Sequence, residues 1–184
     1  DREIMLAAVE RYPKLFSRIM PELQQDLDII TVAIDSSTAL TVLNMVGGRF
    51  QQEHPEVTVK AISVSGLSVL RLMQSSIPNP LWSKYDVAVA WMKRMRRVPA
   101  GSNALLTNRD FCLMIAEYAQ RDFSTVAEEL RGDYNFMREA VDKNGLVLRH
   151  ASMELRCNMQ LVVRAMASNK NSLCPQIPIT EKAL

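Results

Sequence analysis

Seven segments of this chain repeat one pattern, in which apolar residues follow a starting residue at the third, fourth, seventh and eighth positions. The starting residues are Asp1, Asp26, His54, Ser83, Asn108, Asp133 and Asn158. Successive starts are about 25 residues apart, with slightly longer steps after Asp26 and His54. A period of this length is typical of repeat proteins, in which each repeat packs against its neighbours. The pattern restricts the fold strongly, because every repeat has the same apolar stripe to bury.

The spacing of the stripe predicts an α-helix at the start of each repeat, since these positions share one helix face. The seventh position holds alanine in six repeats and Ile115 in the fifth, and alanine lets helix backbones approach closely. Six starting residues are Asp, Asn or Ser, whose side chains accept hydrogen bonds from amides of the first helical turn. The alternating pattern of a half-buried strand is absent.

The second half of each repeat is predicted to form a shorter helix. Leucine recurs at one position near the end of four repeats, as Leu23, Leu105, Leu130 and Leu155. Turn signals separate the halves at Pro13 and at Asn144 with Gly145, residues that stop a helix or tolerate a positive φ. Helices this short are marginal in water unless they pack against others.

The predicted fold is therefore all-α, an α-solenoid of tandem short helical hairpins with repeats of about 25 residues. A single array is expected over residues 1–173, followed by an extended tail at 174–184. The tail is too short and too rich in proline to fold alone. It is expected to be held by the solenoid or by a neighbouring subunit.

Composition fits a chain with a substantial aliphatic core. Of its 184 residues, 48% are hydrophobic and 6% aromatic, and most of the eleven methionines are expected to fill gaps in the core. No apolar run approaches the length of a membrane span. No signal-like segment opens the chain, and because it begins at Asp1 without a methionine, we expect a processed or truncated product. Cys112, Cys157 and Cys174 show no CxxC spacing, so reduced thiols are expected, in cytoplasm or an organelle interior.

Motifs for catalysis, metals or cofactors are missing from the sequence. It contains no GxSxG, no phosphate-binding glycine loop and no HExxH. His54 and His150 are too far apart in sequence to suggest a metal site, and His150 with Glu154 fits a surface interaction better than acid–base chemistry. The sequence therefore predicts a protein that is not an enzyme and needs no cofactor or metal.

Positive charge is concentrated in the fourth repeat. Residues 83–107 carry five basic side chains and one acid, Asp86, within a chain of net charge +2. Four of these basic residues, Lys93, Arg94, Arg96 and Arg97, lie close together in sequence. They predict either contact with an anion or a solvated helix end, where cations complement the helix dipole. One such patch without interleaved aromatic residues argues against a nucleic-acid-binding protein.

An insertion precedes this basic repeat. Its sequence, Ile77-Pro-Asn-Pro-Leu-Trp82, cannot continue a helix. Repeat proteins often use such insertions for binding, so Trp82 is a candidate contact residue together with the basic cluster. The alternative is that Trp82 fills a gap left by an irregular repeat.

Residues 133–156 closely resemble the helical repeat family called domain of unknown function 4116. They read Asp-Tyr-Asn-Phe-Met-Arg-Glu-Ala-Val-Asp-Lys-Asn-Gly-Leu-Val-Leu-Arg-His-Ala-Ser-Met-Glu-Leu-Arg. The resemblance lies in the acidic start, the Ala-Val pair, the Asn-Gly turn, the Leu-x-x-Ala-Ser step and the closing Leu. It is best over 133–157 and extends to 1–25 and 158–173, where the first helices match. It implies helical hairpin repeats without an established activity, and so no catalytic residue.

The leading functional prediction is a non-catalytic scaffold for protein–protein interaction. We expect an accessory subunit of a larger assembly, such as a respiratory or photosynthetic organellar membrane complex, with peripheral membrane association left open. Neither end of the array shows a strongly polar capping repeat, so a partner is expected to cover it. The alternative is a module that binds nucleic acid, phosphate or anionic lipid through the basic fourth repeat.

Overall fold

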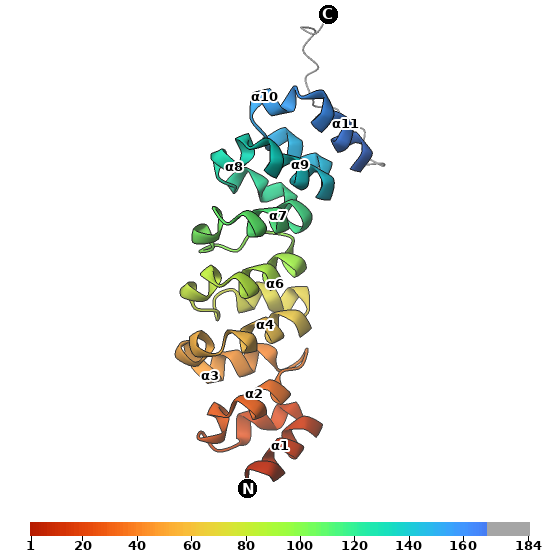
Figure 1. Ribbon diagram of the computed structural model, residues 1–184. Helices are drawn as coiled ribbons and strands as arrows, with labels where there is room; N and C mark the ends of the chain where they lie inside the picture. Colours follow the sequence, from red (N-terminus) through yellow and green to blue (C-terminus); the bar gives the residue numbers. More distant parts are fainter. Residues whose placement is uncertain (169–184) are drawn as a thin grey trace, which may run out of the picture. The chain divides into compact units, whose positions relative to one another are not determined.

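The computed structural model describes residues 1–168, and the predicted tail at 174–184 lies outside them. Every regular element within residues 1–168 is helical, so the prediction of an all-α chain is confirmed. The described residues fall into two compact units, and Figure 1 colours the helices of both along the sequence. The N-terminal unit comprises residues 1–95 and 99–101, and the C-terminal unit comprises 96–98 and the residues from Ser102 onward.

The N-terminal unit contains six α-helices and three short 3-10 helices among the described residues. They are α1 (Arg2–Arg11), η1 (Pro13–Arg18), η2 (Leu23–Gln25), α2 (Leu27–Ala33), α3 (Ala39–Glu53), α4 (Pro55–Val64), α5 (Leu67–Met73), η3 (Asn79–Ser83) and α6 (Tyr85–Met95). Helix α3 is interrupted at Gly47, whose φ of 73° is outside the helical region.

The described part of the C-terminal unit contains five α-helices and three 3-10 helices. They are η4 (Asn103–Leu105), α7 (Arg109–Tyr118), η5 (Gln120–Thr125), α8 (Glu128–Gly132), α9 (Tyr134–Lys143), η6 (Gly145–His150), α10 (Met153–Arg156) and α11 (Met159–Ser168). We call the helix that opens each repeat its first helix: α1, α2, α4 and α6 in the N-terminal unit, and α7, α9 and α11 in the C-terminal unit.

Five of the seven starting residues cap their helices as the sequence indicates. The side chains of Asp1, Asp26, Asn108, Asp133 and Asn158 each accept a hydrogen bond from an amide two or three positions later. His54 occupies the cap position of α4 but its side chain accepts no bond from an amide of the first turn, and its Nδ1 lies 3.1 Å from Glu56 Oε1. Ser83 does not cap α6, because its hydroxyl donates to Pro80 O and the helix begins at Tyr85.

The predicted apolar stripe is fully buried in the second, third, fifth and sixth repeats. Its members there are Ile29, Ile30, Ala33, Ile34, Val57, Thr58, Ala61, Ile62, Phe111, Cys112, Ile115, Ala116, Phe136, Met137, Ala140 and Val141. In the fourth repeat the register is shifted by one residue: Asp86 is exposed, whereas Ala88 and Met92 are buried. Ile4 and Met166, assigned to the core from sequence, are exposed, which corrects that assignment.

The second halves differ between long and short repeats. The two longer repeats, which start at Asp26 and His54, hold true α-helices, α3 and α5. The shorter repeats instead use 3-10 helices and one-turn α-helices. The 3-10 helix, with hydrogen bonds between residues three apart, is typical of such short segments. Asn144 turns the chain with φ −158° rather than a positive angle, and its side chain accepts a hydrogen bond from Leu146 N.

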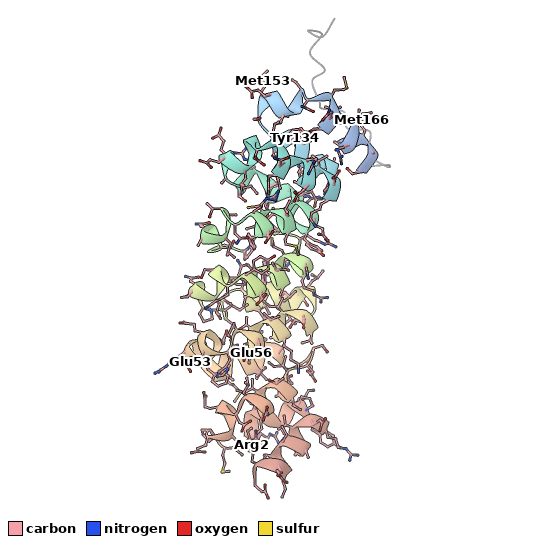
Figure 2. The ribbon with its side chains drawn as sticks, in the orientation of Figure 1. Arg2, Glu53, Glu56, Tyr134, Met153 and Met166 are labelled. Atoms are coloured by element: carbon pink, nitrogen blue, oxygen red, sulfur yellow. The ribbon has the colours of Figure 1, made fainter. Side chains whose placement is uncertain are left out.

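Within each unit, consecutive first helices pack against one another. The neighbouring pairs are α1 with α2, α2 with α4, α4 with α6, α7 with α9, and α9 with α11. Figure 1 shows α4 and α6 next to each other, and Figure 2 labels Arg2 on α1. The Arg2 guanidinium binds the Asp26 carboxylate at 2.6 Å and the Asp28 carboxylate at 2.5 Å. These bonds join the first two repeats.

Polar bonds also join the first helices of the C-terminal unit. Ion pairs link Arg109 to Glu139, Lys143 to Glu117 and Arg164 to Asp142, each with a shortest distance of 2.9 Å.

The connecting segments of the C-terminal unit are joined by main-chain hydrogen bonds. Ala127 N donates to Leu106 O at 3.5 Å, and Ser152 N donates to Arg131 O at 3.1 Å. The donor and the acceptor of the second bond both lie further along the chain than those of the first, by the same number of residues that separates the starts Asn108 and Asp133. One contact therefore recurs with the repeat period.

Candidate functional site

A groove runs between the first helices α4 and α6 of the N-terminal unit. It consists of two adjoining hollows of about 410 and 370 Å³. Their lining residues are Pro55, Glu56, Val59, Lys60, Ser63, Asp86, Val89, Ala90, Lys93 and Arg94. Glu56 and Asp86 lie in the first turns of the two helices, and Lys93 and Arg94 lie in the last turn of α6. The groove thus combines an apolar floor with acidic and basic ends.

A second groove, of about 550 Å³, lies between α9 and α11 in the C-terminal unit. Its lining residues are Tyr134, Arg138, Met159, Gln160, Val163 and Arg164. Polar bridges join the two helices at both ends: the Tyr134 hydroxyl donates to Gln160 Oε1 at 2.7 Å, and Arg164 Nη1 donates to Asp142 Oδ1 at 2.9 Å. Figure 2 labels Tyr134 on α9 and Met166 on α11.

The two grooves share four lining positions, but the helix that supplies them precedes its neighbour in one groove (α4) and follows it in the other (α11). In the third repeat, the lining residues of α4 include those at the first, second, fifth and sixth positions after the start: Pro55, Glu56, Val59 and Lys60. The same four positions of the seventh repeat supply Met159, Gln160, Val163 and Arg164. The same helix face therefore borders a groove in two separate compact units.

A further hollow, of about 630 Å³, lies elsewhere in the N-terminal unit. It is lined by η1 and by residues around the start of α3: Tyr12, Pro13, Lys14, Leu15, Phe16, Ser17, Arg18, Ser37, Thr38, Thr41 and Val42. Its buried hydroxyl, on Thr38, already donates to Ala33 O, and Asp35 binds the neighbouring amides. These bonds stabilise the turn and leave no buried polar group directed at a ligand.

The basic residues singled out from the sequence are divided between the two units. In the N-terminal unit, Arg94 Nη2 donates to Ser65 O at 2.5 Å, at the end of α4, and Lys93 borders the α4–α6 groove. In the C-terminal unit, the Arg96 guanidinium lies 5.3 Å from the centre of the Tyr118 ring, and Arg97 lies 3.8 Å from the Asp122 carboxylate. Each arginine thus has a partner within its own unit.

Trp82 is a core residue. It is 2% exposed, and its ring packs edge-on against Trp91 with centroids 5.0 Å apart. A Cβ at Gly101 would lie 3.3 Å from Trp82 Cβ, so the turn at Gly101 also packs closely against this residue. The prediction of Trp82 as a surface contact is therefore wrong, and the alternative, filling a gap beside an irregular repeat, describes its environment.

Outside the grooves, His150 and Cys112 are ionisable groups whose pKa values are shifted. Within residues 1–168, no three His, Cys, Asp or Glu side chains come together in a way that could hold a metal. Burial, with help from the nearby Arg149 and Arg131, lowers the pKa of His150, and its Nε2 accepts a hydrogen bond from Arg149. Burial raises the pKa of Cys112 to about 11, so this thiol stays protonated near neutral pH.

Membrane-spanning segments are also missing from the part of the chain that is described. None of its helices is both long enough and apolar enough to cross a bilayer. This agrees with the prediction from hydropathy.

The sequence did not identify the residues of the α9–α11 groove. A signal was present, however, in the spacing of Met159, Val163 and Met166, which forms a second apolar stripe on one helix. This stripe is ambiguous in the sequence, because Met166 also fits the core pattern of the repeat.

Residues 133–175 match a family model described as domain of unknown function, DUF4116. The match covers the sixth repeat and the first helix of the seventh, as the sequence resemblance indicated, and does not include residues 1–25. Comparison with curated proteins and with solved structures gave no match.

Proposed function

We propose that this chain is a non-catalytic helical-repeat scaffold that binds other proteins through the exposed faces of its first helices. The finer architecture we propose is an α-solenoid of tandem hairpins. It is supported by the packing of consecutive first helices within each unit and by the main-chain bond that recurs with the repeat period.

The observation that carries the function is the recurrence of a groove between successive first helices, between the third and fourth repeats and again between the sixth and seventh. Grooves between neighbouring helices of repeat proteins form extended binding surfaces. Both grooves combine exposed charged groups with apolar side chains, as protein interfaces do. Neither contains an arrangement of nucleophile, base and oxyanion donors that would support catalysis.

An accessory subunit of a larger assembly is the biological role that we propose, and an organellar membrane complex remains our expectation for that assembly. The anion-binding alternative is less well supported, because Arg94, Arg96 and Arg97 are each engaged with groups of the protein. Binding a polyanion would require these cations to exchange their present partners.

Purification of the tagged chain from its own cells tests the scaffold proposal. We expect it to co-purify with defined subunits in constant stoichiometry through two different columns and at about 0.5 M salt, which screens simple charge attraction. A monomer without stoichiometric partners would contradict the proposal. Binding to nucleic acid or anionic vesicles that is lost steeply as salt rises would instead support the anion-binding alternative.

A further inference from the structure

Helix α11 carries apolar stripes on two opposite faces. Leu161 and Ala165 are buried within the C-terminal unit. Met159, Val163 and Met166 are 71%, 57% and 62% exposed. Because they recur at i, i+4 and i+7, they form a single stripe on the side opposite the buried one. A surface helix usually presents polar residues on that side, so this stripe is suited to packing against another helix.

The stripe includes a position that, in α7 and α9, contacts the first helix of the following repeat. The residue one position after the start points to the following first helix in both earlier repeats: Arg109 pairs with Glu139, and Tyr134 binds Gln160. Met159 holds this position in the seventh repeat. A helix is therefore the element whose shape fits the stripe, since α9 and α11 already pack on their predecessors in this way.

The charges beside the stripe favour an acidic partner. Arg138 and Arg164 line the α9–α11 groove together with Met159 and Val163 of the stripe, and no carboxylate is among its lining residues. Arg164 is paired with Asp142, whereas Arg138 forms no ion pair within the described residues. A contact of this surface with a second copy of itself would bring guanidinium groups together without compensating carboxylates.

We propose that the stripe formed by Met159, Val163 and Met166, together with Arg138, binds an amphipathic helix of a partner protein whose apolar stripe is bordered by carboxylates. This inference rests on the proposed scaffold function and specifies its surface and the chemistry of its partner. The apolar side chains supply most of the contact, and Arg138 selects the acidic border.

Two labelled synthetic helices test this proposal on the full chain. Both are about three heptads long with the same leucine stripe, bordered by Glu in one peptide and by Lys in the other. We expect saturable binding of the Glu peptide in fluorescence anisotropy, and at least about tenfold weaker binding of the Lys peptide. Val163→Asp is expected to weaken binding of the Glu peptide at least about tenfold, and Arg138→Glu to reverse the preference between peptides.

Leu72→Asp is the matched control, because Leu72 is 62% exposed and lies on α5 in the other unit. It should leave peptide binding unchanged, and circular dichroism should show the same helicity for all variants. Equal binding of both peptides, or binding insensitive to Val163→Asp, would overturn the proposal. So would a wild-type dimer that Val163→Asp dissociates in sedimentation, since the occupant would then be a second copy.

The outcome also separates this inference from the scaffold function. If the chain co-purifies with defined subunits and Val163→Asp does not disturb that complex, the inference is wrong and the scaffold function stands. If no stoichiometric complex forms with the wild-type chain, the scaffold function itself fails, whatever the peptides do.

Discussion

The rings of Trp82 and of Trp91 on α6 pack edge to face, with the two planes inclined at 73°. Trp82 comes from the insertion that precedes the fourth repeat, and Trp91 from the eighth position of that repeat. Such edge-to-face contacts are favourable beyond the area that they bury. The insertion thus contributes to the core of the N-terminal unit, where the fourth repeat departs from the regular pattern.

Replacing Trp82 by alanine should destabilise the N-terminal unit by about 3–5 kcal/mol, because a large buried ring is removed and a cavity remains. Urea unfolding followed by circular dichroism measures the loss. The chain has two tryptophans, both in this contact, so fluorescence of the remaining Trp91 reports on the same unit. Lys84→Ala, an exposed neighbour, should change stability by less than about 0.5 kcal/mol. A similar effect of the two variants would contradict the buried role of Trp82.

Gly101→Ala should also destabilise the N-terminal unit, by about 1–2 kcal/mol. Gly101 has a φ of 97°, which strains any other residue, and a Cβ there would lie 3.3 Å from Trp82 Cβ. Gly132→Ala is the comparison, since Gly132 ends helix α8 and nothing lies within 4 Å of its Cβ position. This second variant should be neutral or more stable by about 0.5 kcal/mol. Thermal unfolding measures the stability of both variants. A Gly101→Ala variant as stable as the wild type would contradict the prediction.

Asp26→Asn should reduce the stability of the protein at neutral pH but not at strongly acidic pH. The hydrogen bond from Arg2, which stabilises the carboxylate form, is the main cause that lowers the pKa of Asp26 below its ordinary 3.8. A carboxyl with a lowered pKa in the folded state stabilises the protein above its unfolded pKa, and this contribution is lost as pH falls through the folded value. Asparagine keeps the capping oxygen, so the variant isolates the charge.

The expected decrease in Tm is no more than about 3 °C at pH 7, because the ion pair is partly exposed. The difference between wild type and variant should disappear as pH falls below about 4. Asp110→Asn, in the first turn of α7, serves as a control for removing an acid near a helix N-terminus. A Tm difference that persists unchanged at pH 2 would show that the charge of Asp26 is not its cause.

Cys112 should resist thiol reagents in the native protein. In a Cys157→Ser, Cys174→Ser background, we expect negligible modification at pH 8 and rapid modification after unfolding in urea, because the thiol is buried and its pKa is about 11. The raised pKa also implies stability that is complete below pH 9 and is lost as pH rises toward 11. Alkylation followed by mass spectrometry measures the rates. Fast native modification would show that the core around α7 opens readily.

The sequence was sufficient to predict where helices begin. Capping residues and a stripe of period 3.6 both belong to a single helix, so they could be recognised without tertiary information. The distinction between α- and 3-10 helices in the second halves was not predictable from leucine spacing. It depends on how many residues each connector has, and only α3 and α5 have enough for a true α-helix.

The candidate site was predicted less well than the fold. Residues close in sequence, such as Arg94 and Arg96, suggested a single basic patch, yet they belong to different compact units and contact different partners. The grooves form between the first helices of successive repeats. Which of their side chains stay exposed depends on how the neighbouring repeat packs, and a single repeat sequence does not contain that information. Whether one array extends over residues 1–173 remains a prediction.

The main-chain bonds from Ala127 N to Leu106 O and from Ser152 N to Arg131 O do not depend on which side chains occupy those positions. Mutation can therefore change many connector residues during evolution, as long as the donor positions do not become proline, while insertion of a single amino acid would displace donor from acceptor. Selection on such a chain acts on the length of its modules more strictly than on their composition, and whole modules can be gained or lost by duplication and deletion of coding segments of the same length.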